Sequence, residues 1–299
     1  MGTAKQIIVT GGTGYVGSRV ARVLADRGYN VVVVDKVRPE ERGITFPYGV
    51  EYRHHDLRNT DEVMKALAGG GVLLHLAADI GSLMYMHEHQ AEIITNNAAI
   101  DVATYAAAKE CGITWIIYSS SSMIYQHVSH YPYTEEDAQH IEPPSNVYGF
   151  SKLSGEFFCK AYRAQYGIPF TILRYHNIYG PGEDSKGSSP GDIHVIPALL
   201  EKVIVKKQYP LEILGDPSAT RPFTYVDDAV EATVRIVTLA HDKSDVVRDT
   251  DFNVGTNRYH SIEELGKIIW KLFKNYPLSN KNYISGNFSV IVVRLRPSP

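Results

Sequence analysis

Apolar residues in the first half of the chain occur in two alternating patterns. Short continuous apolar runs predict strands that are buried on both faces, at 6–10, 30–35, 72–78 and 113–119. Helical spacing between these runs predicts helices over 15–27 and 92–111, the second of which is stopped by Gly112. Strict alternation of strand and helix predicts an α/β fold with a doubly wound parallel sheet, in which a ligand binds at the edge where the strands end.

The second half of the chain is less regular. A helix is predicted over 148–166 and ends at Gly167, and a strand follows at 169–174. Residues 180–192 are rich in Gly, Pro and Ser, and the length of this loop suggests a lid or a binding role. The remaining periodic segments predict helices at 195–207, 226–239 and 262–274 and short strands at 211–214 and 252–254.

Composition and charge exclude several classes of partner. The 299 residues carry a net charge of −3 with both signs scattered, which argues against nucleic acid or an acidic membrane surface. No leader pattern and no run of about 20 apolar residues is present, so we expect a cytoplasmic protein. Cys111 and Cys159 lack metal-type spacing, and the histidines at 54–55, 87 and 89 lack acidic or cysteine partners, so no metal site is expected.

A glycine-rich turn follows the first predicted strand and opens the first helix. Gly11, Gly14 and Gly17 would let the backbone turn tightly and approach a pyrophosphate at the helix N-terminus. Asp35 ends the next strand about 20 residues on, where a carboxylate binds ribose hydroxyls and repels a 2′-phosphate. The pattern predicts a dinucleotide site that prefers NAD to NADP, although Lys36 adds a neighbouring cation.

A phenol and an ammonium share one face of the helix predicted over 148–166. Tyr148 and Lys152 are four residues apart, and a nearby cation favours the phenolate that a proton acceptor requires. The serine run 119–122 follows a predicted strand, where hydroxyls would point into the ligand crevice. These residue types together predict proton abstraction from a substrate hydroxyl.

The motifs together resemble the extended short-chain dehydrogenase/reductase family, in its NAD-dependent nucleotide-sugar epimerase/dehydratase group. The resemblance runs from Gly11 to about Gly255. It includes the segment 174–181, similar to the family's substrate-domain signature, and the segment 221–228, similar to the one whose arginine grips a diphosphate.

This resemblance implies two domains. Residues 1–175 would form an NAD-binding Rossmann domain that includes the Tyr148–Lys152 helix, and residues 176–299 a smaller mixed α/β substrate-binding lobe. Segments such as 223–255 would be able to return to the Rossmann core. A homodimer is also implied, because in relatives the two long helices of the first domain pack against their copies as a four-helix bundle.

The resemblance also implies the site residues. The catalytic residues would be Ser121, Tyr148 and Lys152. Residues at the strand ends would bind NAD: Gly11, Gly14, Tyr15, Val16, Asp35, Lys36, Asp56, Leu57, Leu76, Ala77, Ala78, Asn97, Ser119, Tyr148, Lys152 and Tyr175. A second set would bind a UDP- or GDP-linked sugar: Ser121, Ser122, Met123, Asn177, Lys186, Val195, Arg221 and Arg294.

The implied reaction is epimerisation at C4 of the sugar through a transient 4-keto intermediate. The main alternative is a GDP-mannose 3,5-epimerase-like reaction, because 77–81, 176–181 and 186–187 resemble that subfamily. Met123 stands where that subfamily has its base cysteine, and a thioether cannot move protons. A dehydratase is less favoured, because 122–124 is Ser-Met-Ile where dehydratases carry Thr-Asp-Glu; a reductase and a non-catalytic NAD-binding regulator are further alternatives.

Overall fold

The computed structural model describes residues 6–183, 193–208, 211, 213 and 215–275. A seven-stranded sheet, in which every neighbouring pair is parallel, runs through its centre in the order β10-β6-β5-β4-β1-β2-β3. The strands span Ile7–Thr10 (β1), Val31–Asp35 (β2), Glu51–His54 (β3), Gly71–His75 (β4), Ile113–Ser121 (β5), Phe170–Tyr175 (β6) and Thr250–Val254 (β10). The predicted fold class is confirmed.

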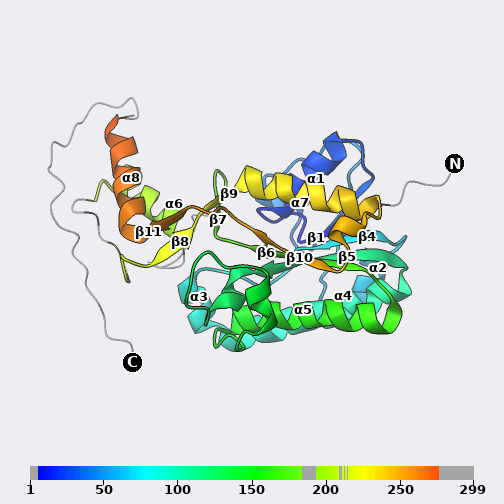
Figure 1. Ribbon diagram of the computed structural model, residues 1–299. Helices are drawn as coiled ribbons and strands as arrows, with labels where there is room; N and C mark the ends of the chain where they lie inside the picture. Colours follow the sequence, from blue (N-terminus) through cyan, green and yellow to red (C-terminus); the bar gives the residue numbers. More distant parts are fainter. Residues whose placement is uncertain (1–5, 184–192, 209–210, 212, 214, 276–299) are drawn as a thin grey trace.

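Helices cover both faces of the sheet (Figure 1). One face is covered by α1 (Gly17–Asp26) and α7 (Val226–His241). The other is covered by α2 (Thr60–Ala66), α4 (Gln90–Glu110) and α5 (Val147–Tyr166), with α3 (Leu83–Glu88) beside α4.

The continuous apolar runs become strands because both faces of the sheet are buried. Ile7 and Val9 of β1 pack in the layer of α1 and α7, whereas Ile8 between them packs in the layer of α2, α4 and α5. All three side chains are fully buried. A strand in this position has no polar face, so its sequence does not alternate.

A smaller lobe lies beyond one end of the sheet (Figure 1). Its apolar core joins α6 to α8, and Leu199 and Leu265 are both buried in it. The elements of the lobe are α6 (Val195–Leu200), a π-helical turn (Glu201–Val205), α8 (Ile262–Asn275) and the antiparallel strands β8 (Thr220–Pro222) and β11 (Tyr259–Ser261). The parallel pair β7 (Ile178–Tyr179) and β9 (Thr224–Tyr225) precedes α7.

Several elements differ from the sequence-based expectation. The helix expected over 195–207 changes from α to π geometry after Leu200, and α2 and α3 were not anticipated. The strand expected over 211–214 and the loop expected over 180–192 lie partly outside the described residues. Helix α7 packs on one face of the sheet and β10 is the edge strand beside β6, although both follow residue 176 in the sequence.

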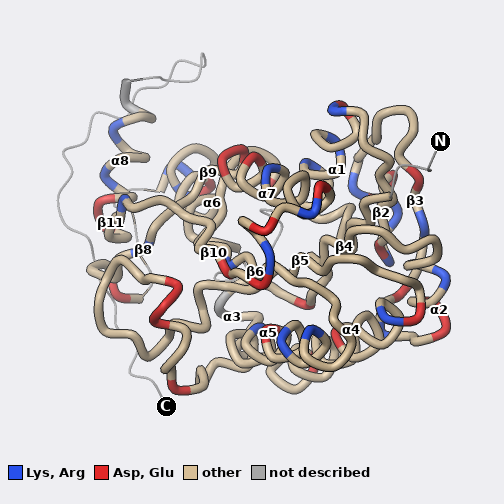
Figure 2. Tube along the Cα trace, turned by 45° about the vertical axis from the view of Figure 1, so that its right-hand side comes forward, with Lys and Arg blue, Asp and Glu red and all other residues tan. Residues whose placement is uncertain are grey.

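Cationic and anionic residues are interspersed in the view of Figure 2. Within the described part of the chain, no helix combines the length and the apolar character that a membrane span requires. The same part contains no group of three or more acidic, His or Cys side chains able to hold a metal ion.

Candidate active site

The glycine-rich turn between β1 and α1 is packed against the end of β4. Gly11 has a φ of +65°, and a Cβ there would lie 2.8 Å from the Ala77 backbone nitrogen. A Cβ on Gly17 would lie 2.3 Å from the Gly11 oxygen, so neither position accepts a side chain. At Gly14 a Cβ would approach only the Gly11 backbone oxygen closely, because the far side of the turn is open. Such a turn fits the close approach of a dinucleotide phosphate.

Asp35 faces this turn from the end of β2. Its carboxylate accepts hydrogen bonds from the Thr13 and Val37 backbone N–H groups, at 3.1 and 3.0 Å, which fixes its orientation. Lys36 points outward and is exposed, whereas the Arg42 guanidinium donates to the Thr13 carbonyl at 3.3 Å. Sequence reasoning missed Arg42, because it lies in a short 3₁₀ turn with no motif around it.

The two residues expected to contact adenine, Asp56 and Leu57, are already engaged with other parts of the protein. Both carboxylate oxygens of Asp56 accept hydrogen bonds from the Arg58 guanidinium, and this hydrogen bonding lowers the pKa of the Asp56 carboxyl to about 2. Leu57 is buried in the core beneath the sheet. Leu76, Ala77 and Ala78 follow β4 and are half-buried.

Tyr148 and Lys152 lie side by side at the start of α5. Asn146 caps this helix by accepting from the Tyr148 and Gly149 backbone N–H groups, at 3.0 and 3.1 Å. Tyr148 is 6% exposed and Lys152 3%, and the Lys152 Nζ lies 6.0 Å from the Tyr148 ring centroid. The register of the helix therefore brings the phenol and the ammonium into one buried pocket wall.

Burial dominates the protonation of this pair. It raises the pKa of the Tyr148 phenol, and a hydrogen bond with Ser121 opposes this effect without cancelling it. Burial also lowers the pKa of Lys152 to about 8. The sequence-based expectation that the neighbouring ammonium would lower the pKa of Tyr148 is therefore outweighed, because desolvation penalises the charged forms of both groups.

Ser119 and Ser121 lie within β5, which is two residues longer than the strand expected over 113–119. Pairing with β6 continues to Ser121 opposite Tyr175, so the serines end a strand and do not form a turn. The Ser121 Oγ accepts from the Met123 backbone N–H at 3.2 Å and caps the 3₁₀ turn that holds Ser122 and Met123.

Asn97 connects three elements around this pair. Its amide nitrogen donates to the Asp79 carbonyl and to the Ser151 Oγ, both at 3.1 Å, and its oxygen accepts from the Asp79 N–H at 2.6 Å. Ser151 in turn donates to the Tyr148 carbonyl at 2.8 Å. Asn97 thus fixes the loop after β4 against the first turn of α5.

Other expected site residues are spread over both lobes. The Tyr15 hydroxyl is buried without a hydrogen-bond partner among the described residues, and Val16 precedes α1. Tyr175 is hydrogen-bonded to Thr233 at 2.8 Å. On the substrate side, Asn177 adopts a φ of +28°, Val195 begins α6 and Arg221 is exposed on β8. Lys186 and Arg294 lie outside the described residues.

His194 and Glu183 form a histidine–carboxylate pair that sequence reasoning also missed. The His194 Nδ1 lies 2.6 Å from the Glu183 Oε1, and this hydrogen bond raises the pKa of His194. The same imidazole hydrogen-bonds to the backbone of Gly81, which follows β4. Eleven residues separate the two partners, and no local pattern indicates such a contact.

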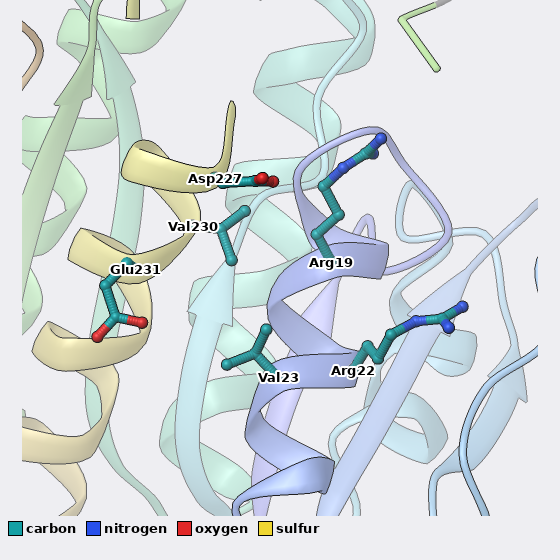
Figure 3. Close-up of a pocket in the computed structure, with 6 residues that line it drawn as sticks. All are labelled: Arg19, Arg22, Val23, Asp227, Val230 and Glu231. Atoms are coloured by element: carbon teal, nitrogen blue, oxygen red, sulfur yellow. The ribbon is translucent and has the colours of Figure 1, made fainter. Parts of the chain in front are cut away.

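A hollow of 340 Å³ lies between α1 and α7 (Figure 3), and none of the expected catalytic residues lines it. Its two guanidinium groups are already engaged: Arg19 donates to the Tyr15 carbonyl at 2.7 Å and Arg22 to the Thr45 carbonyl at 2.9 Å. The expected site remains the edge where the strands end, because the glycine turn follows β1 and Ser121 ends β5 at that edge.

Comparison with known proteins places this arrangement in context. The model of the NAD dependent epimerase/dehydratase family matches residues 7–255. GDP-mannose 3,5-epimerase 1 of Oryza sativa subsp. japonica is 31% identical over 268 residues, covering 88% of this chain and 68% of that protein. A putative UDP-glucose 4-epimerase of Methanocaldococcus jannaschii is 31% identical over 265 residues, covering 88% and 81%. The crystal structure of Thermotoga maritima UDP-glucose 4-epimerase with UDP-glucose superposes with a TM-score of 0.76 at 26% identity, covering 90% and 82%.

Proposed function

Since this chain belongs to the NAD dependent epimerase/dehydratase family, we propose that it epimerises a nucleotide-diphosphate sugar at C4 through a transient 4-keto intermediate. The observation that carries the proposal is the buried juxtaposition of Tyr148, Lys152 and Ser121, at the same strand-end edge of the parallel sheet as the glycine turn. The names of the relatives reported above refer to GDP-mannose and UDP-glucose, which supports a UDP- or GDP-linked sugar as the substrate.

Three side chains have separate roles in removing the proton of the sugar hydroxyl. Ser121 hydrogen-bonds to the C4 oxygen of the sugar, and Tyr148 removes the proton of that hydroxyl. Lys152 binds the ribose next to the nicotinamide and stabilises the phenolate by its charge. When bound, NAD supplies the acceptor and donor of the C4 hydrogen.

The remaining residues hold and orient the two ligands. Gly11 and Gly14 accommodate the pyrophosphate of NAD, and Asp35 binds the adenosine ribose. Asn177 and Arg221 anchor the diphosphate end of the sugar nucleotide, so that the ring is positioned over Ser121.

The 3₁₀ turn after β5 favours C4 chemistry over 3,5-epimerisation. A 3,5-epimerase has to remove carbon-bound protons and therefore needs an additional base beside the ring. Met123 is half-buried in this turn and its thioether cannot accept a proton, and no base among the described residues is hydrogen-bonded to the Ser122 hydroxyl beside it.

The proposal is tested by incubating the NAD-loaded protein in D₂O with a panel of UDP-, GDP- and dTDP-sugars and reading the products by NMR. We expect inversion at C4 with no deuterium at C3 or C5. Tyr148→Phe is the matched control, and it should retain NAD while losing at least about ten-fold in turnover. Deuterium at C3 or C5 would instead assign 3,5-epimerisation, and turnover of no sugar nucleotide would reject the proposed function.

A further inference from the structure

A line of buried polar side chains crosses the sheet next to the proposed site. The Thr10 Oγ1 lies 2.7 Å from the His75 Nδ1, and the His75 Nε2 lies 3.2 Å from the Asp101 Oδ1. The Tyr118 hydroxyl donates to the other oxygen of Asp101 at 3.2 Å. The four residues come from β1, β4, α4 and β5, and none is more than 4% exposed. Asp101 is thus a carboxylate held inside the protein.

Two side chains face the oxygens of this carboxylate. Burial raises the pKa of Tyr118 well above its usual value, so its hydroxyl remains a donor toward Asp101. The Thr10 hydroxyl accepts from the Ala77 N–H at 3.4 Å and can donate to His75, which leaves the Nε2–H of a neutral imidazole to donate to Asp101. A carboxylate that accepts from both sides is stabilised in its charged form.

Lys152 lies over the Tyr118 ring. Its Nζ is 5.0 Å from the centroid of that ring, while the hydroxyl of the ring is bound to Asp101. No carboxylate of the described residues forms an ion pair with Lys152. Glu156, one turn further along α5, has both oxygens bound to Arg174, at 2.9 Å each. Asp101 is therefore the buried carboxylate left to balance the ammonium.

We propose that Asp101 is the internal counter-ion of Lys152, a positioning residue that acts across the Tyr118 ring and keeps the amine charged in its buried pocket. The groups that face Lys152 are Tyr148 from its own helix, Tyr118 from β5 and Asp101 from α4, with His75 of β4 behind Asp101. Of these, Asp101 alone carries a negative charge while both phenols are protonated.

The electrostatics of the pocket agree with this geometry. Desolvation lowers the pKa of Lys152 to about 8, and Asp101 is the group that acts in the opposite direction. Loss of that carboxylate would leave burial unopposed and would neutralise Lys152 near neutral pH. The inference rests on the proposed function for its consequence, because a neutral Lys152 cannot stabilise the Tyr148 phenolate.

The test is the titration of Lys152 in the NAD-bound protein, followed by NMR of lysine labelled at Cε, with the resonance assigned by its loss in Lys152→Met. Asp101→Asn should lower the pKa of Lys152 by about one unit or more. Thr104→Val is the matched control: Thr104 is buried on the same helix and its hydroxyl has no partner among the described residues, so the titration should not move.

An unchanged pKa of Lys152 in Asp101→Asn would overturn the proposal. Asp101→Thr provides a second neutral variant that retains an acceptor for His75. The wild-type protein is informative by itself, because an amine that is already neutral at pH 7 would also overturn the proposal. The titration needs no sugar, so a failure of Asp101 in this role is distinguished from a failure of the proposed function.

Activity supplies a second readout once a substrate is known. The alkaline limb of the kcat–pH profile should move to lower pH in Asp101→Asn, with KM little changed at pH values below the limb. A variant that lowers kcat equally at all pH values would show a purely structural role for Asp101 and would also contradict the proposal.

Discussion

Two helix glycines should respond in opposite ways to the same substitution. Gly155 lies within α5 and Gly266 within α8. A Cβ on Gly155 would lie 1.9 Å from the Tyr118 hydroxyl oxygen and 2.1 Å from the ring carbon that bears it. A Cβ on Gly266 would lie 3.5 Å from the nearest atom, in the Leu211 side chain, which is an ordinary contact.

The magnitudes decide the sign at each position. Helix propensity favours alanine over glycine by about 1 kcal/mol in a helix interior, at both positions. At Gly155 this gain is opposed by overlap with a buried ring that hydrogen-bonds to Asp101, and overpacking of this severity costs about 3 kcal/mol or more. We therefore expect Gly155→Ala to lower the free energy of unfolding by about 2 kcal/mol or more, and Gly266→Ala to raise it by about 1 kcal/mol.

Thermal unfolding followed by circular dichroism measures both changes. At about 2–4 °C per kcal/mol, Gly155→Ala should melt at least roughly 4 °C lower, and Gly266→Ala roughly 2–4 °C higher, than the parent protein. Gly155→Ala should also lose activity, because Tyr148 and Lys152 share its helix. If Gly155→Ala melts at or above the parent temperature, the close packing of α5 on β5 described above is wrong.

Three other outcomes can be measured directly. Calorimetry should show tighter binding of NAD than of NADP, because Asp35 faces the ribose position; equal affinities would remove Asp35 from that role. Burial lowers the pKa of Lys152 to about 8 from 10.5, so in NAD-free protein the lysine opposes folding fully below pH 8 and progressively less as the pH rises toward 10.5. Lys152→Met should therefore raise the free energy of unfolding by an amount on the order of 3 kcal/mol at pH 7, seen as a higher Tm, and by much less at pH 10. The same variant should abolish turnover. Light scattering should show a homodimer at micromolar concentration, since Val102, Phe150 and Phe157 are exposed on α4 and α5; a monomer would leave these apolar side chains facing water.

Local patterns in the sequence were sufficient for the central sheet. Val31–Asp35 and Ile113–Ser121 are strands, and the short apolar run in each is typical of a strand covered on both faces. The glycine turn and the spacing of Tyr148 and Lys152 are equally local, so their positions at a strand end and on one helix face could be predicted. The extent of β5 could not, because pairing with β6 is what holds Ser119–Ser121 extended.

The contacts that set the charge of the proposed site depend on tertiary structure. Thr10 and His75 are 65 residues apart, and His75 and Asp101 are 26 apart, so no periodicity connects them. In the sequence, nothing distinguishes Asp101 from any other aspartate in a helix. The packing of α4 on the sheet buries it beside Tyr118. Sequence by itself determined which residue types stand at the strand ends, because that information is local. Only the fold decided which of them are desolvated and which carboxylate faces Lys152, because burial and charge pairing arise between segments that are distant along the chain.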